Sequence, residues 1–322
     1  MNKNLQGIIE QIFSEPELLK DPPVLIDIGA SGNIHERWKM IAPYAVCIAF
    51  DADNREMGYI EKENSGYKKL IVINSIVSDR KDSLIEFYLT RSPFCSSTLD
   101  PDLENLRNYE FAQLFEVEKK IKLNAVHLPD VLAKLNIHSI DWYKSDSQGT
   151  DLRLFKSLDQ QLSKKIIVAE FEPGIIDAYK EEDKLHALMN NMDTLPFWMS
   201  SMDVKGNSRI RSDVFSSFNS EDRKKIHRSL KVSPAWAELV YFNTFESENL
   251  QTNRNLLLGW TFATLLSQHG FALQMADKLK AVRSSKLADS LKDFSIHSLT
   301  HPQHDLRKRI IGKINRILKR FE

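Results

Sequence analysis

Short runs of apolar residues recur between Val24 and Phe245 and are separated by polar stretches with helical spacing. Five of these runs have the length of a strand and do not alternate between apolar and polar residues; they cover 24–28, 45–50, 70–73, 140–144 and 166–171. Strands that are buried on both faces show this pattern, whereas a half-exposed strand alternates. The pattern therefore predicts an α/β fold whose mainly parallel sheet is covered by helices on both faces.

Weaker signals fill in the rest of this region. The segments 83–89, 197–202 and 237–245 are strand-like, and the stretch 203–220 between the last two is compatible with a hairpin-type edge of the sheet. Helices are expected between the strands, at 36–41, 130–135, 151–158 and 183–192. The segment 102–117 is expected to form a helix or a lid.

Both ends of the chain have helical patterns. An apolar stripe in the first 13 residues predicts an amphipathic helix, and Pro22-Pro23 ends this leading segment. Beyond Ser247 the pattern is helical; its uncharged part, 255–276, is too polar for a membrane span and predicts a buried helix broken near Gly270. The expected division is an N-terminal helix at 1–23, an α/β domain at 24–246 and a helical extension at 247–322.

Composition narrows the class of protein. The 322 residues include 42% hydrophobic and 27% charged residues, which is ordinary for a globular protein and argues against disorder. Because 44 basic residues balance 44 acidic ones, no partner with the charge of nucleic acid is expected. Two cysteines, Cys47 and Cys95, provide no disulfide framework and indicate a reducing, cytoplasmic setting.

The end of the chain is basic. Residues 301–322 contain seven basic and two acidic residues, so this tail carries a formal charge of +5. Its apolar residues form one helical stripe, so 304–322 is expected either to dock on the protein or to lie on the inner face of an anionic membrane. The nearby His297, His301, His304 and Asp305 are explained by a loop and a helix cap, so no metal site is expected.

A glycine turn follows the first predicted strand. Asp27 lies near the end of this strand, and Gly29-Ala30-Ser31-Gly32 comes directly after it. Asp51 ends the second strand, where a carboxylate can accept hydrogen bonds from the ribose hydroxyls of an adenosine cofactor. The dinucleotide motif needs a third glycine that this turn lacks, and Asp27 suits a cationic ligand better than a phosphate. These features favour S-adenosylmethionine over NAD, although both glycines could be plain turn residues.

A second polar group follows the later strands. Lys144, Asp146 and Gln148 lie at the end of the fourth strand, and Glu170 and Glu172 lie on or just past the fifth. In an open α/β sheet, the carboxyl ends of neighbouring strands border one crevice where ligands bind. We therefore expect these side chains to converge there, although Lys144 could simply form a salt bridge.

The sequence resembles the FkbM-type methyltransferases, a class I family dependent on S-adenosylmethionine. The resemblance covers roughly 24–246 and is carried by the segments 25–43, 48–56, 74–90, 96–102, 140–158 and 168–179. It implies a Rossmann-like fold with a mainly parallel seven-stranded sheet. The second-strand Glu-Pro of the family is Asp51-Ala52 here, and the Glu after the motif glycine is Asp151, so both side chains are one methylene shorter.

The resemblance also implies roles for individual residues. Asp27 and the turn Gly29-Ala30-Ser31-Gly32 would hold the methionine end of the cofactor, Asp51-Ala52 the ribose, and the segment beginning at Ser75-Ile76 the adenine. Asp146 would lie beside the reacting centre. Ser96, Ser97 and Thr98 would face the acceptor. The other candidate acceptor contacts, which rest on their place at the strand ends and not on the resemblance, are Gln148, Glu170 and Glu172.

The expected reaction is methyl transfer to a hydroxyl of a sugar, glycan or small metabolite; the sugar preference comes only from the family. An alcohol needs a general base, for which Asp146 is the first candidate and His35 the second, with Lys144 completing the catalytic set. Phe94, Tyr109, Phe111 and Phe115 could line the acceptor pocket or form a core stripe under a lid.

Two other functions are compatible with parts of the pattern. The first is a non-catalytic methyltransferase-like module that acts as a partner in polysaccharide assembly, against which the retained Asp51 and Asp146 argue. The second is a nucleotide-dependent oxidoreductase, disfavoured by the missing glycine. The sequence leaves the acceptor and the oligomeric state open.

Overall fold

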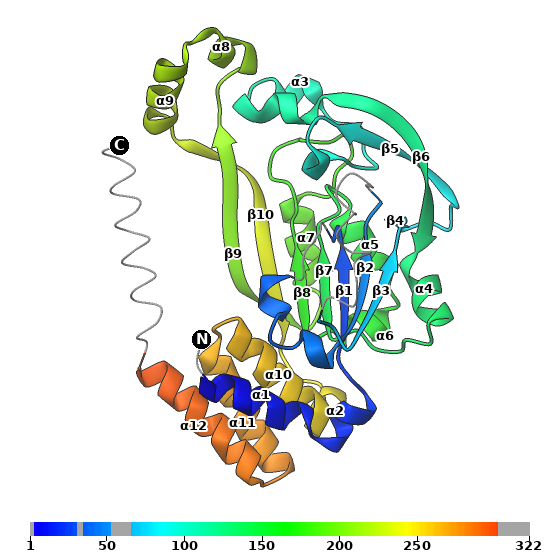
Figure 1. Cartoon of the computed structure of the whole chain (residues 1–322), viewed down its shortest axis with the longest axis vertical. Helices are drawn as coiled ribbons and strands as arrows, with labels where there is room; N and C mark the ends of the chain where they lie inside the picture. Colours follow the sequence, from blue (N-terminus) through cyan, green and yellow to red (C-terminus); the bar gives the residue numbers. More distant parts are fainter. Residues whose placement is uncertain (1–2, 31–34, 53–65, 302–322) are drawn as a thin grey trace.

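A seven-stranded sheet forms the centre of the molecule. The structure is a computed structural model and describes residues 3–30, 35–52 and 66–301. The strand order is β3-β2-β1-β7-β8-β10-β9 (Figure 1). The strands are β1 (Val24–Ile28), β2 (Val46–Phe50), β3 (Lys69–Ile73), β7 (Trp142–Ser145), β8 (Val168–Phe171), β9 (Phe197–Ser208) and β10 (Val232–Asn243). All pairs are parallel except those of β10 with β8 and β9, which confirms the expected Rossmann-like fold.

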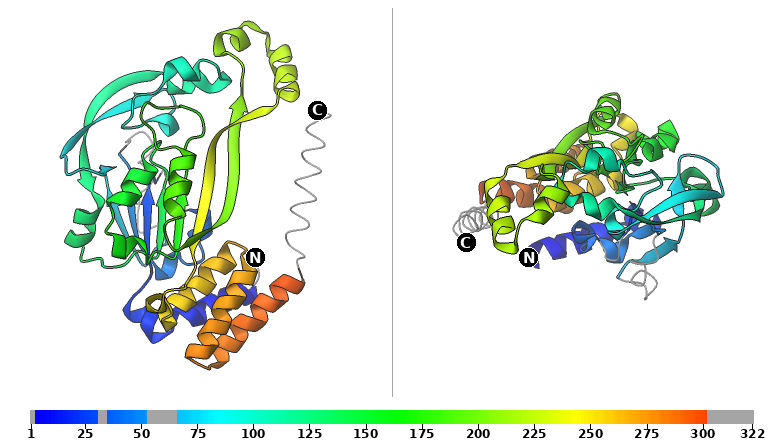
Figure 2. Two further views of the ribbon diagram at one scale, coloured as in Figure 1. Left: turned by 180° about the vertical axis from the view of Figure 1, so that it is seen from behind. Right: turned by 90° about the horizontal axis from the view of Figure 1, so that it is seen from above.

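Helices cover both faces of this sheet, as expected. One face packs on α4 (Leu128–Lys134), α5 (Asp151–Ser157) and α7 (Leu185–Met192), with α6 (Gln160–Ser163) beside them. The other face packs on α1 (Lys3–Phe13), α2 (Pro16–Lys20), α10 (Asn253–Leu265), α11 (His269–Val282) and α12 (Lys286–Thr300). We call α1, α10, α11 and α12 the helical bundle; Figures 1 and 2 show it at one end of the molecule.

The helical bundle joins the two terminal regions of the sequence. Residues of α1, including Ile9 and Ile12, share one apolar core with α10–α12 and with the sheet residues Trp142 and Phe242. Since burial of apolar surface is the main favourable term in folding, both terminal regions stabilise the same sheet face. Short 3-10 helices complete this layer and its connections; they are η1 (Glu36–Trp38), η2 (Ala42–Tyr44) and η6 (Glu248–Leu250).

A second, smaller sheet stands beyond the main one. It has the order β4-β6-β5, with β4 (Ile76–Ser78), β5 (Leu84–Thr90) and β6 (Val117–His127) (Figure 1). The strand expected at 83–89 is therefore present, but its partner β6 was not predicted. The expected helix or lid at 102–117 is a short α3 (Leu103–Leu106) and a 3-10 helix, η5 (Glu110–Phe115); a further 3-10 helix, η4 (Pro93–Cys95), follows β5.

The last two strands form the expected hairpin-type edge, but they are much longer than predicted. β9 and β10 are each 12 residues long and pair antiparallel. Two helices between them, α8 (Ser212–Ser217) and α9 (Ser220–Ser229), were not predicted, because their sequences are polar and lack an apolar stripe. This part projects from the top of the molecule in Figure 1.

The uncharged segment 255–276 forms two buried helices, α10 and α11, with a break between Leu265 and His269. The expected break near Gly270 lies slightly too late in the sequence. Ser267 has the left-handed φ of 59° at the break, whereas Gly270 belongs to the first turn of α11. Among the described residues, every helix is too short or too polar to span a bilayer. The tail expected to form a basic helix, 304–322, lies outside those residues.

Candidate functional site

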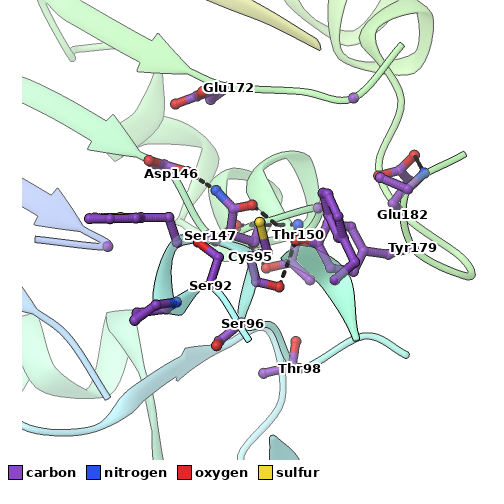
Figure 3. Close-up of a pocket in the computed structure, with 18 of the residues that line it drawn as sticks. Ser92, Cys95, Ser96, Thr98, Asp146, Ser147, Thr150, Glu172, Tyr179 and Glu182 are labelled. Atoms are coloured by element: carbon purple, nitrogen blue, oxygen red, sulfur yellow. Dashed lines mark hydrogen bonds between the residues drawn. The ribbon is translucent and has the colours of Figure 1, made fainter. Parts of the chain in front are cut away.

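A cavity of about 540 Å³ opens at the carboxyl ends of the central strands, which is a usual size for a small-molecule site (Figure 3). It lies beside the position where the strand order reverses, between β1 and β7, the place where open α/β sheets bind ligands. One side is formed by the ends of β1 and β2 and by the start of β4; the other is formed by η4, η5, β10 and the segment 172–182. We call this the main cavity.

Gly29 shapes the floor of the main cavity. Its φ is +77°, a left-handed value, and its amide donates to the Phe50 carbonyl over 3.0 Å. A Cβ at this position would lie 2.1 Å from the Asp146 carbonyl oxygen, so only glycine lets the turn approach the end of β7 this closely. The turn after β1 is therefore built to hold its backbone against Asp146.

Gly29→Ala is expected to reduce stability by about 1–3 kcal/mol, since the added Cβ is strained by φ and collides with a backbone atom. S-adenosylhomocysteine affinity should fall at least tenfold in calorimetry because the floor of the cavity must shift. Gly7→Ala is a matched control: no atom lies within 4 Å of its added Cβ, and a glycine in mid-helix is replaced. Unchanged stability and affinity in Gly29→Ala would contradict this account of the turn.

Most residues expected to bind the cofactor are near one another. Gly29, Asp51-Ala52 and Ser75-Ile76 line the main cavity, and Ala30 is buried beside it, where its amide donates to the Phe50 carbonyl over 3.0 Å. Ser31 and Gly32 lie outside the described residues. The strand ends thus bring the predicted ribose and adenine positions to one wall.

The side chains of Asp27 and Lys144 pair with each other and do not face the main cavity. They lie opposite each other in the β1–β7 register, and the Lys144 ammonium donates to Asp27 Oδ1 over 2.7 Å. Burial disfavours the charged form of Lys144, but the Asp27 and Asp146 carboxylates outweigh this and hold its pKa above the usual value. Neither side chain lines the main cavity. Lys144 therefore acts as a permanent cation that neutralises Asp27 beneath the glycine turn.

A second, smaller hollow of about 240 Å³ adjoins the carboxylates of the main cavity. It contains His35, Lys144 and Glu170. Burial and the neighbouring Lys144 lower the pKa of His35 to about 4, so the imidazole is neutral at pH 7. Glu170 accepts from Arg37 over 2.5 Å and from the Trp142 indole over 2.7 Å. The candidate base His35 and the candidate acceptor contact Glu170 thus lie in this hollow and not among the residues of the main cavity.

Asp146 and Glu172 form a carboxyl pair where the two spaces meet, since both line the main cavity and the small hollow (Figure 3). They come from the ends of neighbouring strands, β7 and β8. Burial, the Asp146 charge and the Glu238 charge raise the pKa of Glu172 to about 9. At pH 7 Glu172 is therefore protonated beside Asp146.

Glu172 should make stability fall as pH rises from about 4.5 to 9, because over this range the native state keeps a proton that the unfolded state releases. The slope for one proton is at most about 1.4 kcal/mol per pH unit. Glu172→Gln removes this pH dependence. Urea unfolding at pH 6, 7 and 8 should therefore show that the free energy of unfolding of the variant, relative to that of the parent, increases as the pH rises. The exposed Glu248→Gln should keep the parental slope; parallel curves for Glu172→Gln and the parent would contradict the shifted pKa.

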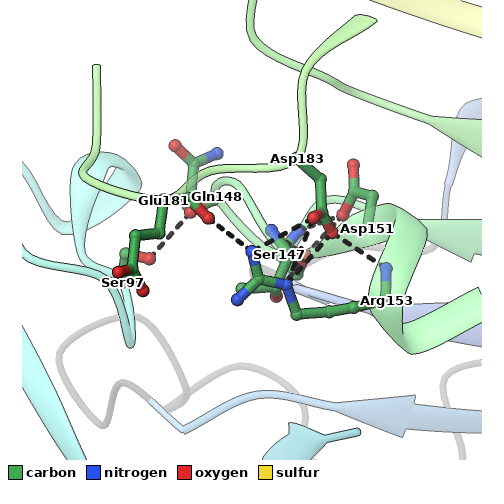
Figure 4. A network of polar contacts seen from close by, with 8 residues as sticks. Ser97, Ser147, Gln148, Asp151, Arg153, Glu181 and Asp183 are labelled. Atoms are coloured by element: carbon green, nitrogen blue, oxygen red, sulfur yellow. Dashed lines mark hydrogen bonds and ion pairs between the residues drawn. The ribbon is translucent and has the colours of Figure 1, made fainter. Parts of the chain in front are cut away.

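Gln148 orients Asp146. The Gln148 amide nitrogen donates to Asp146 Oδ1 over 2.6 Å, and the Tyr179 hydroxyl lies 3.0 Å from Gln148 Oε1. The Gln148 backbone is held in turn, because the Ser97 hydroxyl donates to its carbonyl over 2.7 Å (Figure 4). Ser97 is thus a buried support and does not line the cavity, unlike Ser96 and Thr98. Tyr179 was not predicted as a site residue, although it ends one of the segments that carry the resemblance.

Asp151 holds the loop that carries these residues. Its carboxylate accepts from the Ser145 hydroxyl over 2.7 Å, from the Ser147 amide over 2.9 Å and from the Glu172 amide over 2.9 Å. Nearby, Arg153 is paired with Asp183 over 3.1 Å (Figure 4). The shorter side chain at position 151 therefore still links the ends of β7 and β8.

The aromatic residues considered for the acceptor pocket are divided. Phe94, Phe111 and Phe115 line the main cavity, together with Trp236 and Tyr179, which were not predicted. Tyr109 lies behind them, its ring 5.9 Å from that of Phe111. Trp236 precedes the apolar part of β10, and no local motif distinguishes it. In the described ranges 3–30, 35–52 and 66–301, no group of three or more His, Cys, Asp or Glu residues could hold a metal ion.

This combination defines the class of protein. A mainly parallel sheet with one antiparallel strand, a glycine turn after β1 and an acidic residue after β2 constitute a Rossmann-like methyltransferase domain. Residues 44–196 match the family model described as the methyltransferase FkbM domain. The resemblance found in the sequence is thereby confirmed. Searches of curated proteins and of solved structures each gave no match.

Proposed function

We propose that the chain is an S-adenosylmethionine-dependent methyltransferase that methylates a hydroxyl of a small molecule or glycan. The observation that carries this proposal is a single cavity with a carboxylate towards each end, Asp51 after β2 and Asp146 after β7, and the Gly29 turn between them. A non-catalytic module would have no need of the protonated Glu172 or of the support for Asp146.

The residues present fit this cofactor. Asp51 would accept hydrogen bonds from the ribose hydroxyls, Ser75 and Ile76 would border the adenine, and Gly29, which has no side chain, lets the turn lie directly against Asp146 at the floor of the cavity. Bound S-adenosylmethionine supplies a methyl group on a positively charged sulfur, already activated for displacement. Asp146 places negative charge where the acceptor would approach.

The carboxyl pair handles the acceptor proton. When the acceptor oxygen bonds to the methyl carbon and the bond from that carbon to sulfur breaks, which leaves S-adenosylhomocysteine, Asp146 would accept the hydroxyl proton. Gln148 keeps an oxygen of Asp146 in position, and Glu172, because it is protonated, adds no second negative charge beside Asp146. Both carboxyls also line the small hollow, which reaches the exposed Asp203 and Glu238 and gives the proton a polar route to solvent.

Calorimetry with S-adenosylmethionine and with NAD tests the proposal. The first should bind and the second should not. Asp51→Asn should weaken S-adenosylmethionine binding about tenfold or more, because hydrogen bonds to a charged acceptor are replaced by weaker ones. The exposed Asp193→Asn should leave the affinity unchanged. Binding of NAD alone, or of neither compound, would refute the proposed cofactor.

A further inference from the structure

The half of the main cavity away from Asp51 has an aromatic wall. The ring centroids of Trp236 and Phe111 are 6.4 Å apart, those of Phe111 and Phe115 are 5.3 Å apart, and those of Phe115 and Tyr179 are 5.6 Å apart. All four residues line the cavity, and Tyr179 and Phe115 are buried. The planes of neighbouring rings are tilted by 38° for Phe111 and Trp236, 77° for Phe111 and Phe115 and 61° for Phe115 and Tyr179, so the four rings form a continuous apolar wall against which a ring-shaped ligand can pack.

The described charged residues that line this half of the main cavity are all acidic. Among the described residues that line the main cavity there is no Lys, Arg or His, whereas Asp146, Glu172 and Glu182 are present. Cations near the cavity are already engaged: Lys184 pairs with Glu182 over 2.7 Å, Arg209 lies over the Tyr109 ring, and Lys144, in the adjoining hollow, pairs with Asp27 over 2.7 Å. The described lining therefore holds carboxyl groups with no cation to receive an anion.

We propose that the acceptor is an uncharged ring alcohol whose apolar face stacks on Phe111 and Trp236, and that a phosphate or carboxylate on the reacting ring prevents binding. This inference rests on the proposed function and specifies its substrate class. The reacting hydroxyl is directed to Asp146, because Asp146 is the carboxylate held by Gln148 at the same end of the cavity.

The physical reason is the cost of burying an unpaired anion. Proteins bind phosphate and carboxylate groups through Arg or Lys side chains, or through several free amides, in charge-assisted hydrogen bonds. Here an anion would instead lie beside the Asp146 carboxylate, where like charges repel and little water screens them. A neutral ring loses only its hydration on the apolar face, and the aromatic wall compensates for that loss.

A matched ligand pair tests this inference: phenyl β-D-glucopyranoside and phenyl β-D-glucuronide differ by one carboxylate. Saturation-transfer NMR measures the affinity of each for the full chain, with and without S-adenosylhomocysteine. The neutral glucoside should bind at least tenfold more tightly. Asp146→Asn should narrow this preference, since it removes the repelling charge.

Substitutions in the aromatic wall provide a second test of the inference. Phe111→Ala and Trp236→Ala should each weaken glucoside binding about tenfold while leaving S-adenosylhomocysteine binding unchanged. Phe218→Ala removes an exposed aromatic ring that directly follows α8 and lies outside the cavity, and it should alter neither affinity. Equal binding of the two sugars, or binding of neither, overturns the inference. Loss of S-adenosylhomocysteine binding alone overturns the proposed function instead.

Discussion

Asp146→Asn is expected to slow methyl transfer about 100- to 10,000-fold, the usual contribution of a general base. Asparagine has nearly the same shape and still accepts from Gln148, but it cannot take the acceptor proton. S-adenosylhomocysteine affinity should stay within a factor of a few. Single-turnover rates measured with saturating cofactor and calorimetry on the same preparation separate these two effects.

Two further variants serve as controls for the Asp146→Asn result. Glu172→Gln keeps an uncharged side chain beside Asp146 and should retain most of the activity at pH 7, whereas the exposed Asp193→Asn should behave as the parent. A near-parental rate in Asp146→Asn would remove it as the base. His35 would then be the remaining candidate base, despite its lowered pKa.

Arg254→Ala is expected to lower the free energy of unfolding by about 3–5 kcal/mol, because it leaves a buried charge without its partner. Two guanidinium nitrogens of Arg254 donate to the two oxygens of Asp141, each over 2.8 Å, and Asp141 is only 3% exposed. Arg254 belongs to α10, and Asp141 directly precedes β7, so the pair fastens the helical bundle to the sheet.

Urea unfolding measures this loss. Lys292→Ala is the matched control, since its pair with Asp277 over 2.7 Å is solvent-exposed and should contribute less than about 1 kcal/mol. The double variant Arg254→Ala with Asp141→Ala should be more stable than Arg254→Ala alone, because no buried charge remains unpaired. A loss no larger than that of the control would show that the pair does not fasten the bundle.

The central strands could be predicted from the sequence because their burial is uniform. β1, β7 and β8 are covered on both faces, so they appear as unbroken apolar runs. β6 escaped prediction because it is largely solvent-facing and its sequence contains several lysines. Its pairing with β5 depends on the fold around it, since strand propensity is set by context.

The site was predictable to a similar extent. Carboxylates that end parallel strands must share one edge, so Asp51, Asp146 and Glu172 were expected to lie near one another. The pairing of Asp27 with Lys144 depends on the register between β1 and β7, for which no local sequence signal exists. Trp236 reaches the cavity only because β10 runs antiparallel beside β8.

The position of β1 has a consequence for where the domain can be divided. The family match spans 44–196, yet the strand between β2 and β7 is Val24–Ile28, which lies outside that span. A shortened protein that contains only residues 44–196 would lack the middle strand β1, the Gly29 turn and the β9–β10 hairpin. Such a fragment would leave one edge each of β2, β7 and β8 unpaired and should aggregate rather than bind any ligand.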